Sequence, residues 1–230
     1  MEILIKISNL VGNIALIIAS GVAIYGINAW RREFRGKRQI ELAEDALTLF
    51  YEAQNVIGAL RSPLGGQEEG TSRKPQKEES PARKSARDAA YAVFERYQNR
   101  QELFNKIYSM RYQFMARFGL EAAKPFEDLR GIVNEIFGAA RRLARLWATD
   151  ISSLRSDQEK NQHFEKQQKY EAVFWDTYDE DDPINPKLDQ VISDIEHVCK
   201  PIIMEKEGMV PSIKEFWSKK IKTKKSKSKT

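Results

Sequence analysis

The sequence predicts an all-α protein with a single N-terminal transmembrane helix followed by a cytosolic antiparallel bundle of four to five helices. A long uncharged apolar run lies near the start of the chain, and apolar residues recur three and four positions apart through most of the rest. No stretch shows the convincing two-residue alternation of a half-buried strand. Amphipathic helices need partners for their apolar faces, so we expect them to pack side by side.

The apolar run extends from Ile7 to Trp30 and contains 24 residues without a charge. At about 1.5 Å per residue, a helix of this length reaches roughly 36 Å, which is enough to cross a hydrocarbon core of about 30 Å. A cleaved signal peptide is the alternative. Its apolar region is typically only about 7 to 15 residues long, and Gly26 to Ala29 form a poor cleavage site. Residues 1–30 are therefore predicted to be a membrane anchor.

Basic residues follow the apolar run directly and predict its orientation. Five cations lie within eight residues, and cations favour the cytoplasmic flank of a membrane helix. We expect a single-pass protein of the cell (inner) membrane, with the N-terminus outside and the remaining chain in the cytoplasm against the anionic leaflet. The predicted contact residues at this flank are Trp30, Arg31, Arg32, Arg35, Lys37 and Arg38.

Small residues share one side of the predicted anchor when they are placed on an ideal helix at about 100° per residue. Such a stripe lets two helices approach closely, and a neighbouring amide can hydrogen-bond across the contact. We expect a homo-oligomer or a pairing with another membrane protein; the alternative is that small residues are simply common in membrane helices. The predicted association residues are Gly12, Asn13, Ala15, Ala19, Ala23 and Gly26.

Two segments separate the anchor from the main bundle. Residues 31–62 combine the basic flank with a first amphipathic helix, in which Gly36 is a candidate kink. Residues 63–84 contain three prolines, three glycines and no aromatic residue, a composition that predicts a flexible linker. Within it, Gly65 to Thr71 superficially resembles a phosphate loop, but the lysine and the preceding strand are missing, so we reject that interpretation.

Residues 85–208 are predicted to form the bundle. Its first helix extends from Ser85 to Phe118 and is closed by Gly119. The next begins near Pro125 and carries a heptad seam typical of a coiled coil, so it is expected to be the central core helix. The seam consists of Phe126, Leu129, Val133, Ile136, Ala140, Leu143 and Trp147.

Two further helices complete the predicted bundle. A weaker one covers roughly residues 158–177, and the last begins at Asn185 and Pro186, a natural cap and first position. The apolar anchors expected in the weaker helix are Phe164, Val173, Phe174 and Trp175. The seam expected in the last helix is Leu188, Val191, Ile195, Val198 and Ile202.

The charge is distributed unevenly. The chain carries +5, of which residues 31–38 contribute +4 and residues 211–230 contribute +7, leaving −6 for the rest. A mildly acidic body is atypical of a nucleic-acid-binding core.

In the lysine-rich tail, residues 209–230, apolar side chains alternate with lysines as in a short helix that lies on a membrane surface. A solvated terminus and RNA binding are the alternatives. The predicted tail contacts with the leaflet are Phe216, Trp217, Lys219 and Lys220.

Catalytic motifs are lacking. The two histidines, His163 and His197, have no metal-ligand partner at short spacing, and the single Cys199 is expected to be a small buried hydrophobe. The acidic cluster at residues 176–182 is dense enough for a cation, but its spacing does not match a calcium loop. We favour a structural use, with the lysine tail or with three partner arginines. These are Arg141, Arg142 and Arg145. No cofactor, metal or small-molecule substrate is indicated.

Three function classes remain. The leading one is a membrane-anchored helical scaffold, adaptor or interaction module that works at the cytoplasmic membrane surface. The runner-up is a pore-type effector whose anchor oligomerises and brings Asn9, Asn13 and Ser20 around a polar path. The third is a metal-dependent enzyme that uses the acidic cluster.

Overall fold

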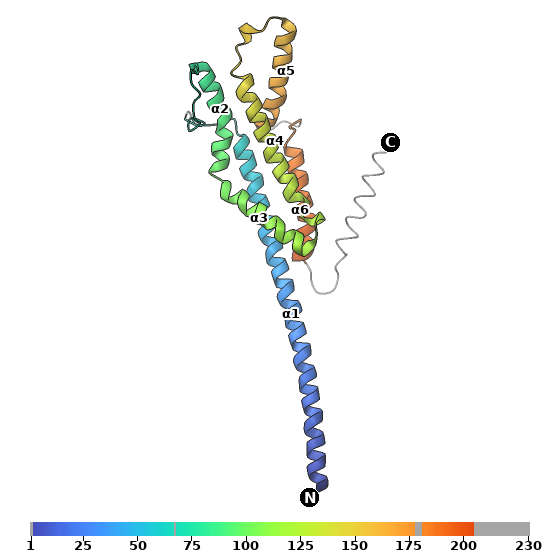
Figure 1. Cartoon of the computed structure of the whole chain (residues 1–230). Helices are drawn as coiled ribbons and strands as arrows, with labels where there is room; N and C mark the ends of the chain where they lie inside the picture. The colour runs from blue at the N-terminus through green and yellow to red at the C-terminus, as the bar shows by residue number, and fades with distance from the viewer. Residues whose placement is uncertain (1, 67, 178–180, 205–230) are drawn as a thin grey trace, which may run out of the picture.

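The computed structural model describes residues 2–66, 68–177 and 181–204, except for the side chains of residues 2–12 and 15 (Figure 1). Within these residues the regular structure is helical throughout, with six α-helices and two short 3-10 helices. The predicted all-α class and the helical bundle are thus confirmed. The sequence predicted four to five helices after the anchor, counting the one in residues 31–62. On the same count the described residues have six, which are the second half of α1 and helices α2 to α6.

Helix α1 (Glu2–Arg61) is one continuous helix of 60 residues. Its first half projects from the bundle as a single rod, and its second half lies inside the bundle (Figure 1). Ala43, Phe50 and Ile57 are fully buried in that second half. Helix α1 continues without a break through Gly36, the candidate kink.

The described residues contain no helix that combines the length and the apolar character required to cross a membrane. The transmembrane part of the predicted fold class therefore receives no support there.

The predicted helix from Ser85 to Phe118 is wrong, because it is two helices, α2 (Pro81–Gln98) and α3 (Gln101–Phe118). The rings of Tyr97 and Phe104, which lie on either side of the break, stack with their centroids 4.7 Å apart. In a straight helix, residues seven apart are separated by about 10 Å along the axis, so this stacking requires the bend. As a result α2 packs on α4 while α3 crosses to α1.

Helix α4 (Lys124–Leu146) is the central helix of the bundle, as predicted. It contacts α2, α3, α5 and α6, and six of its seven seam residues are buried, with Trp147 half-buried just after its end. The ring of Phe126 meets Phe50 of α1 edge to face at 4.8 Å. The 3-10 helix η1 (Glu121–Ala123) leads into α4.

Helices α5 (Asp157–Phe174) and α6 (Asn185–Ile203) close the bundle after the 3-10 helix η2 (Ile151–Ser153). Helix α6 lies antiparallel to α1, with Tyr51 bonded to Glu196 and Gln54 bonded to Asp189. Its predicted seam is buried except for the half-buried Ile202, and Cys199 is buried as expected. Phe164 is an error of the sequence prediction, since its side chain is 45% exposed and His163 faces inward instead.

Candidate functional site

The projecting part of α1 presents apolar side chains to its surroundings on all sides. We call residues 13–34 the exposed rod. Its ten large hydrophobic side chains are between 49% and 71% exposed. They are Ile14, Leu16, Ile17, Ile18, Val22, Ile24, Tyr25, Ile27, Trp30 and Phe34. Monomeric soluble proteins rarely leave so much contiguous apolar surface uncovered, so the exposed rod is the strongest candidate interaction surface of the molecule.

Aromatic and basic side chains mark the end of the exposed rod nearest the bundle. The rings of Trp30 and Phe34 stack with centroids 5.6 Å apart. The predicted cations at this flank are all exposed on the same continuous helix. They are Arg31, Arg32, Arg35, Lys37 and Arg38. A large amphipathic ring beside arginines is the combination found at the headgroup level of membrane helices.

The predicted association residues lie on the same rod. Asn13, Ala19, Ala23 and Gly26 are exposed, and nothing lies within 4 Å of a Cβ built at Gly26. The Ser20 hydroxyl donates to the Leu16 carbonyl oxygen at 2.8 Å, within its own helix. The side chains at Gly12 and Ala15, and all of the predicted tail contacts Phe216, Trp217, Lys219 and Lys220, lie outside the described residues.

A buried polar junction, which the sequence reasoning missed, holds the far end of α1. The Arg61 side chain is fully buried, and its Nη2 lies 2.6 Å from Asp182 Oδ2. Its guanidinium also donates to the carbonyl oxygens of Ala172, Val173 and Trp175, at 2.8 to 3.0 Å. One side chain therefore ties the end of α1 to the end of α5 and to the start of α6.

Asp182 of the acidic cluster belongs to this junction, where its ion-pair partner is Arg61 rather than the predicted Arg141, Arg142 or Arg145. Asp182 Oδ1 accepts the backbone N–H groups of Ile184 and Asn185, both at 2.8 Å, and thereby caps α6. Burial acts to raise the pKa of Asp182, but the hydrogen bonds from Arg61 and the two N–H groups outweigh it and hold the pKa below its usual range. The cap predicted at Asn185 is thus supplied by Asp182, while the Asn185 amide contacts Arg61 and Asp176.

The segment between α1 and α2, predicted as a flexible linker, folds back on α2 through a set of ion pairs. Arg96 of α2 bonds to the Glu69 carboxylate and to the carbonyl oxygens of Leu60 and Ser62 at the end of α1. Gly70 has a φ of +84°, and a Cβ at this position would meet the Asp88 carbonyl oxygen at 1.7 Å. Only glycine allows this close approach of the loop to the α2 backbone.

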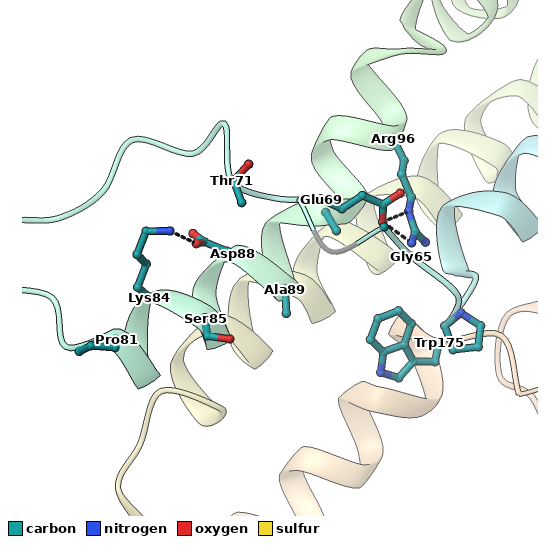
Figure 2. Close-up of a pocket in the computed structure, with 13 residues that line it drawn as sticks. Gly65, Glu69, Thr71, Pro81, Lys84, Ser85, Asp88, Ala89, Arg96 and Trp175 are labelled. Atoms are coloured by element: carbon teal, nitrogen blue, oxygen red, sulfur yellow. Dashed lines mark hydrogen bonds and ion pairs between the residues drawn. The ribbon is translucent and has the colours of Figure 1, made fainter.

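A cavity of about 470 Å³ opens between this loop, α2 and Trp175. Figure 2 shows Glu69 beside Arg96 and Lys84 beside Asp88, with Trp175 at the edge. The Lys84–Asp88 distance is 2.6 Å and the Arg96–Glu69 distance is 2.5 Å. Each cation already has a carboxylate, so the cavity offers no excess charge to an ionic ligand.

The remaining candidate chemical groups are dispersed. His163 is buried on α5, and its Nε2 has no hydrogen-bond partner among the described residues, whereas His197 is exposed on α6. Burial raises the pKa of the Cys199 thiol to about 12. Across the described ranges, no three His, Cys, Asp or Glu side chains are grouped in a way that could hold a metal ion; Asp179 and Glu180 of the acidic cluster lie outside these ranges.

Comparison of the chain with protein families, with curated proteins and with solved structures gives no match. The site is therefore interpreted from its own geometry. Sequence reasoning could locate the exposed rod by its composition. It could not find Arg61 or Gly70, because a basic residue at a helix end and a glycine in a loop are ordinary features until their surroundings are known.

Proposed function

We propose that the protein is a single-pass, membrane-anchored helical scaffold or interaction module. The apolar run of α1 crosses the bilayer once, and the bundle lies at the cytoplasmic surface. The observation that carries this proposal is the exposed rod, on which large apolar side chains point outward around the whole helix. A water-exposed rod of this kind would be unfavourable, because burying one such side chain contributes about 1.5 to 3 kcal/mol.

The sequence of the whole run supports a bilayer as the apolar environment. Ile7 to Trp30 carry no charge, and the cations begin at Arg31. A partner protein would normally cover one stripe of a helix, whereas lipid surrounds it. The stacked Trp30 and Phe34 rings mark the expected cytoplasmic interface.

The continuity of α1 supports a role in presenting or coupling the bundle. The same helix carries the exposed rod and, from Leu42 onward, a face of the hydrophobic core. A rotation or tilt of the membrane part would be passed directly to the bundle, since no loop intervenes. A second copy of the chain or another membrane protein, meeting the side with Ala19, Ala23 and Gly26, is the partner we propose.

Neither alternative function is favoured. The Ser20 hydroxyl is bonded within its own helix, which argues against its lining a polar path. Both carboxylate oxygens of Asp182 are engaged in the Arg61 junction and the cap of α6, which favours a structural use of this acidic residue.

Extraction of membranes at alkaline pH tests the anchor. We expect the native protein to remain in the membrane pellet and an Ile17→Arg, Val22→Arg variant to move to the supernatant, because each charge placed at the centre of a span costs about 2.5 to 3.5 kcal/mol. The matched control is Tyr112→Arg with Leu120→Arg. These two side chains are 65% and 63% exposed on the bundle, similar to Ile17 and Val22. Release of the native protein into the supernatant would contradict the proposed anchor.

Labelling with a membrane-impermeant thiol reagent tests the orientation. Cys199 is buried, so we expect it to be shielded from the reagent. Labelling of a single introduced cysteine then shows on which side of the membrane that residue lies. In intact cells, Glu2→Cys should be labelled and Glu52→Cys should be labelled only after permeabilisation. The opposite pattern would reverse the proposed topology.

A further inference from the structure

An acidic groove lies between α4 and α6 on a face of the bundle that the proposed function does not use. Its volume is about 570 Å³. Ile132 and Val191 form the apolar floor, and Gly131 widens it, because nothing lies within 4 Å of a Cβ built there. The floor is therefore an apolar notch with room for a side chain from outside.

Carboxylates surround the groove. They are Glu127, Asp128, Glu135 and Asp194. Lys187 lies 2.6 Å from Glu135, and Arg111 bonds to Glu127. The four carboxylates and these two cations together carry a formal charge of −2. Gln190, also in the lining, donates to Asp194. The groove thus combines an apolar floor with a rim of net negative charge, which fits a basic amphipathic segment.

The chain itself carries such a segment close to the groove. Helix α6 ends at Ile203, about 14 Å along the helix from Asp194 at the near end of the groove. The nine positions from Met204 to Ile213 span up to about 30 Å if extended, which is enough to return to the groove. Between Ile213 and Lys222 the sequence has four large apolar residues interspersed with four lysines.

We propose that the segment Pro211–Lys222, which lies outside the described residues, docks in this groove. Its apolar side chains enter the notch at Gly131, and its lysines face the rim carboxylates. The same lysines cannot face the groove and an anionic leaflet at once, so the docked state and the membrane-bound state of the tail exclude each other. The docking does not depend on whether α1 spans a bilayer.

Disulfide trapping in the full chain, kept in a nonionic detergent, tests the docking. One variant carries Gln190→Cys in the groove lining and Ser218→Cys in the tail. The matched control carries Asn55→Cys with Ser218→Cys. Asn55 is exposed on α1 at the same level of the bundle, since its neighbour Gln54 contacts Asp189. The native Cys199 is buried and does not compete.

We expect the intramolecular disulfide to form at least about tenfold faster in the groove variant than in the control, because docking raises the effective concentration of the two thiols. Adding Asp128→Asn and Glu135→Gln, or about 0.5 M salt, should bring the rate toward that of the control. Anionic vesicles should slow it by competition. The proposal would be overturned if the disulfide formed at equal rates in the two variants. It would also be overturned if replacing the two carboxylates left the rate in the groove variant unchanged. If no disulfide forms without vesicles, and anionic vesicles protect the tail from proteolysis, the tail would be assigned to the membrane surface instead of the groove.

Discussion

The guanidinium of Arg61 and the carboxylate of Asp182 lie 2.6 Å apart, and their side chains are 0% and 1% exposed. The two residues are 121 positions apart in the chain. Their contact joins the last turn of the long N-terminal helix to the start of the last helix of the bundle. Asp176, whose backbone N–H donates to the Arg61 carbonyl oxygen at 2.8 Å, completes the connection.

Replacing Arg61 by Met should lower the free energy of unfolding by about 3 to 5 kcal/mol, because it leaves the buried Asp182 carboxylate without its cation. Thermal or denaturant unfolding followed by circular dichroism measures the change. The control is Lys187→Met, which removes an ion pair whose side chains are 50% and 39% exposed and should cost less than about 1 kcal/mol. Similar losses for both variants would show that the junction is not a central stabilising contact.

Gly70→Ala should detach the loop from α2. Two features exclude a Cβ at this position. The backbone φ is positive, and an added Cβ would lie only 1.7 Å from the Asp88 carbonyl oxygen. We expect trypsin to cut faster after Arg73 and Lys77 in the variant than in the native protein. Gly66→Ala is the matched control, because the nearest atom to its Cβ is 4.0 Å away, and it should be cut at the native rate.

Acid should weaken the loop contacts through Glu79. Hydrogen bonds from Arg73, at 2.8 Å, and from Arg87, at 2.6 Å, lower the pKa of Glu79 from 4.5 to about 2. Because the pKa is lower in the folded state, this contribution to stability is complete above about pH 4.5 and is lost as the pH falls toward 2.

In Glu79→Gln, the unfolding temperature should therefore fall less steeply between about pH 5 and about pH 2.5 than in the native protein. Thermal scans across this range measure the slope. The exposed Glu165 of α5 supplies the control, and Glu165→Gln should keep the native slope. Identical slopes in all three proteins would contradict the role of Glu79.

Two phenylalanines of α5 should respond very differently to truncation. Phe174 is 1% exposed and packs edge to face on Trp147 at 5.6 Å, so Phe174→Ala should cost about 3 to 5 kcal/mol of unfolding free energy. Phe164 is 45% exposed, and Phe164→Ala should cost less than about 1 kcal/mol. A large loss at Phe164 would mean that its side chain packs more closely in the folded protein than its exposure indicates.

Periodicity predicted the parts of the fold that depend on one face of one helix. The seams of α4 and α6 were predicted residue by residue, because apolar side chains at spacings of three and four must lie on one side of a helix. The same reasoning failed where packing overrides local preference. The break at Asn99 and Arg100 carries no proline or glycine, and it lets α2 and α3 meet different partners.

The candidate site divides in the same way. The exposed rod could be located from the sequence, since its composition is local, whereas its membrane role stays a proposal. The acidic groove could not be located from the sequence, because its walls come from α4 and α6, whose lining residues lie more than fifty positions apart. The loop on α2 was equally hidden, because Gly70 and Asp88 meet only after the chain folds back.

The sequence by itself determined the all-helical class, the apolar N-terminal run with its basic flank, and the buried faces of α4 and α6. These follow from residue type and spacing along one helix. Only the tertiary structure decided that α1 is unbroken, that Arg61 is buried against Asp182, and which acidic side chains share a groove. Ion pairs and grooves are made by residues distant in the chain, and no local pattern specifies which of many similar charges will meet.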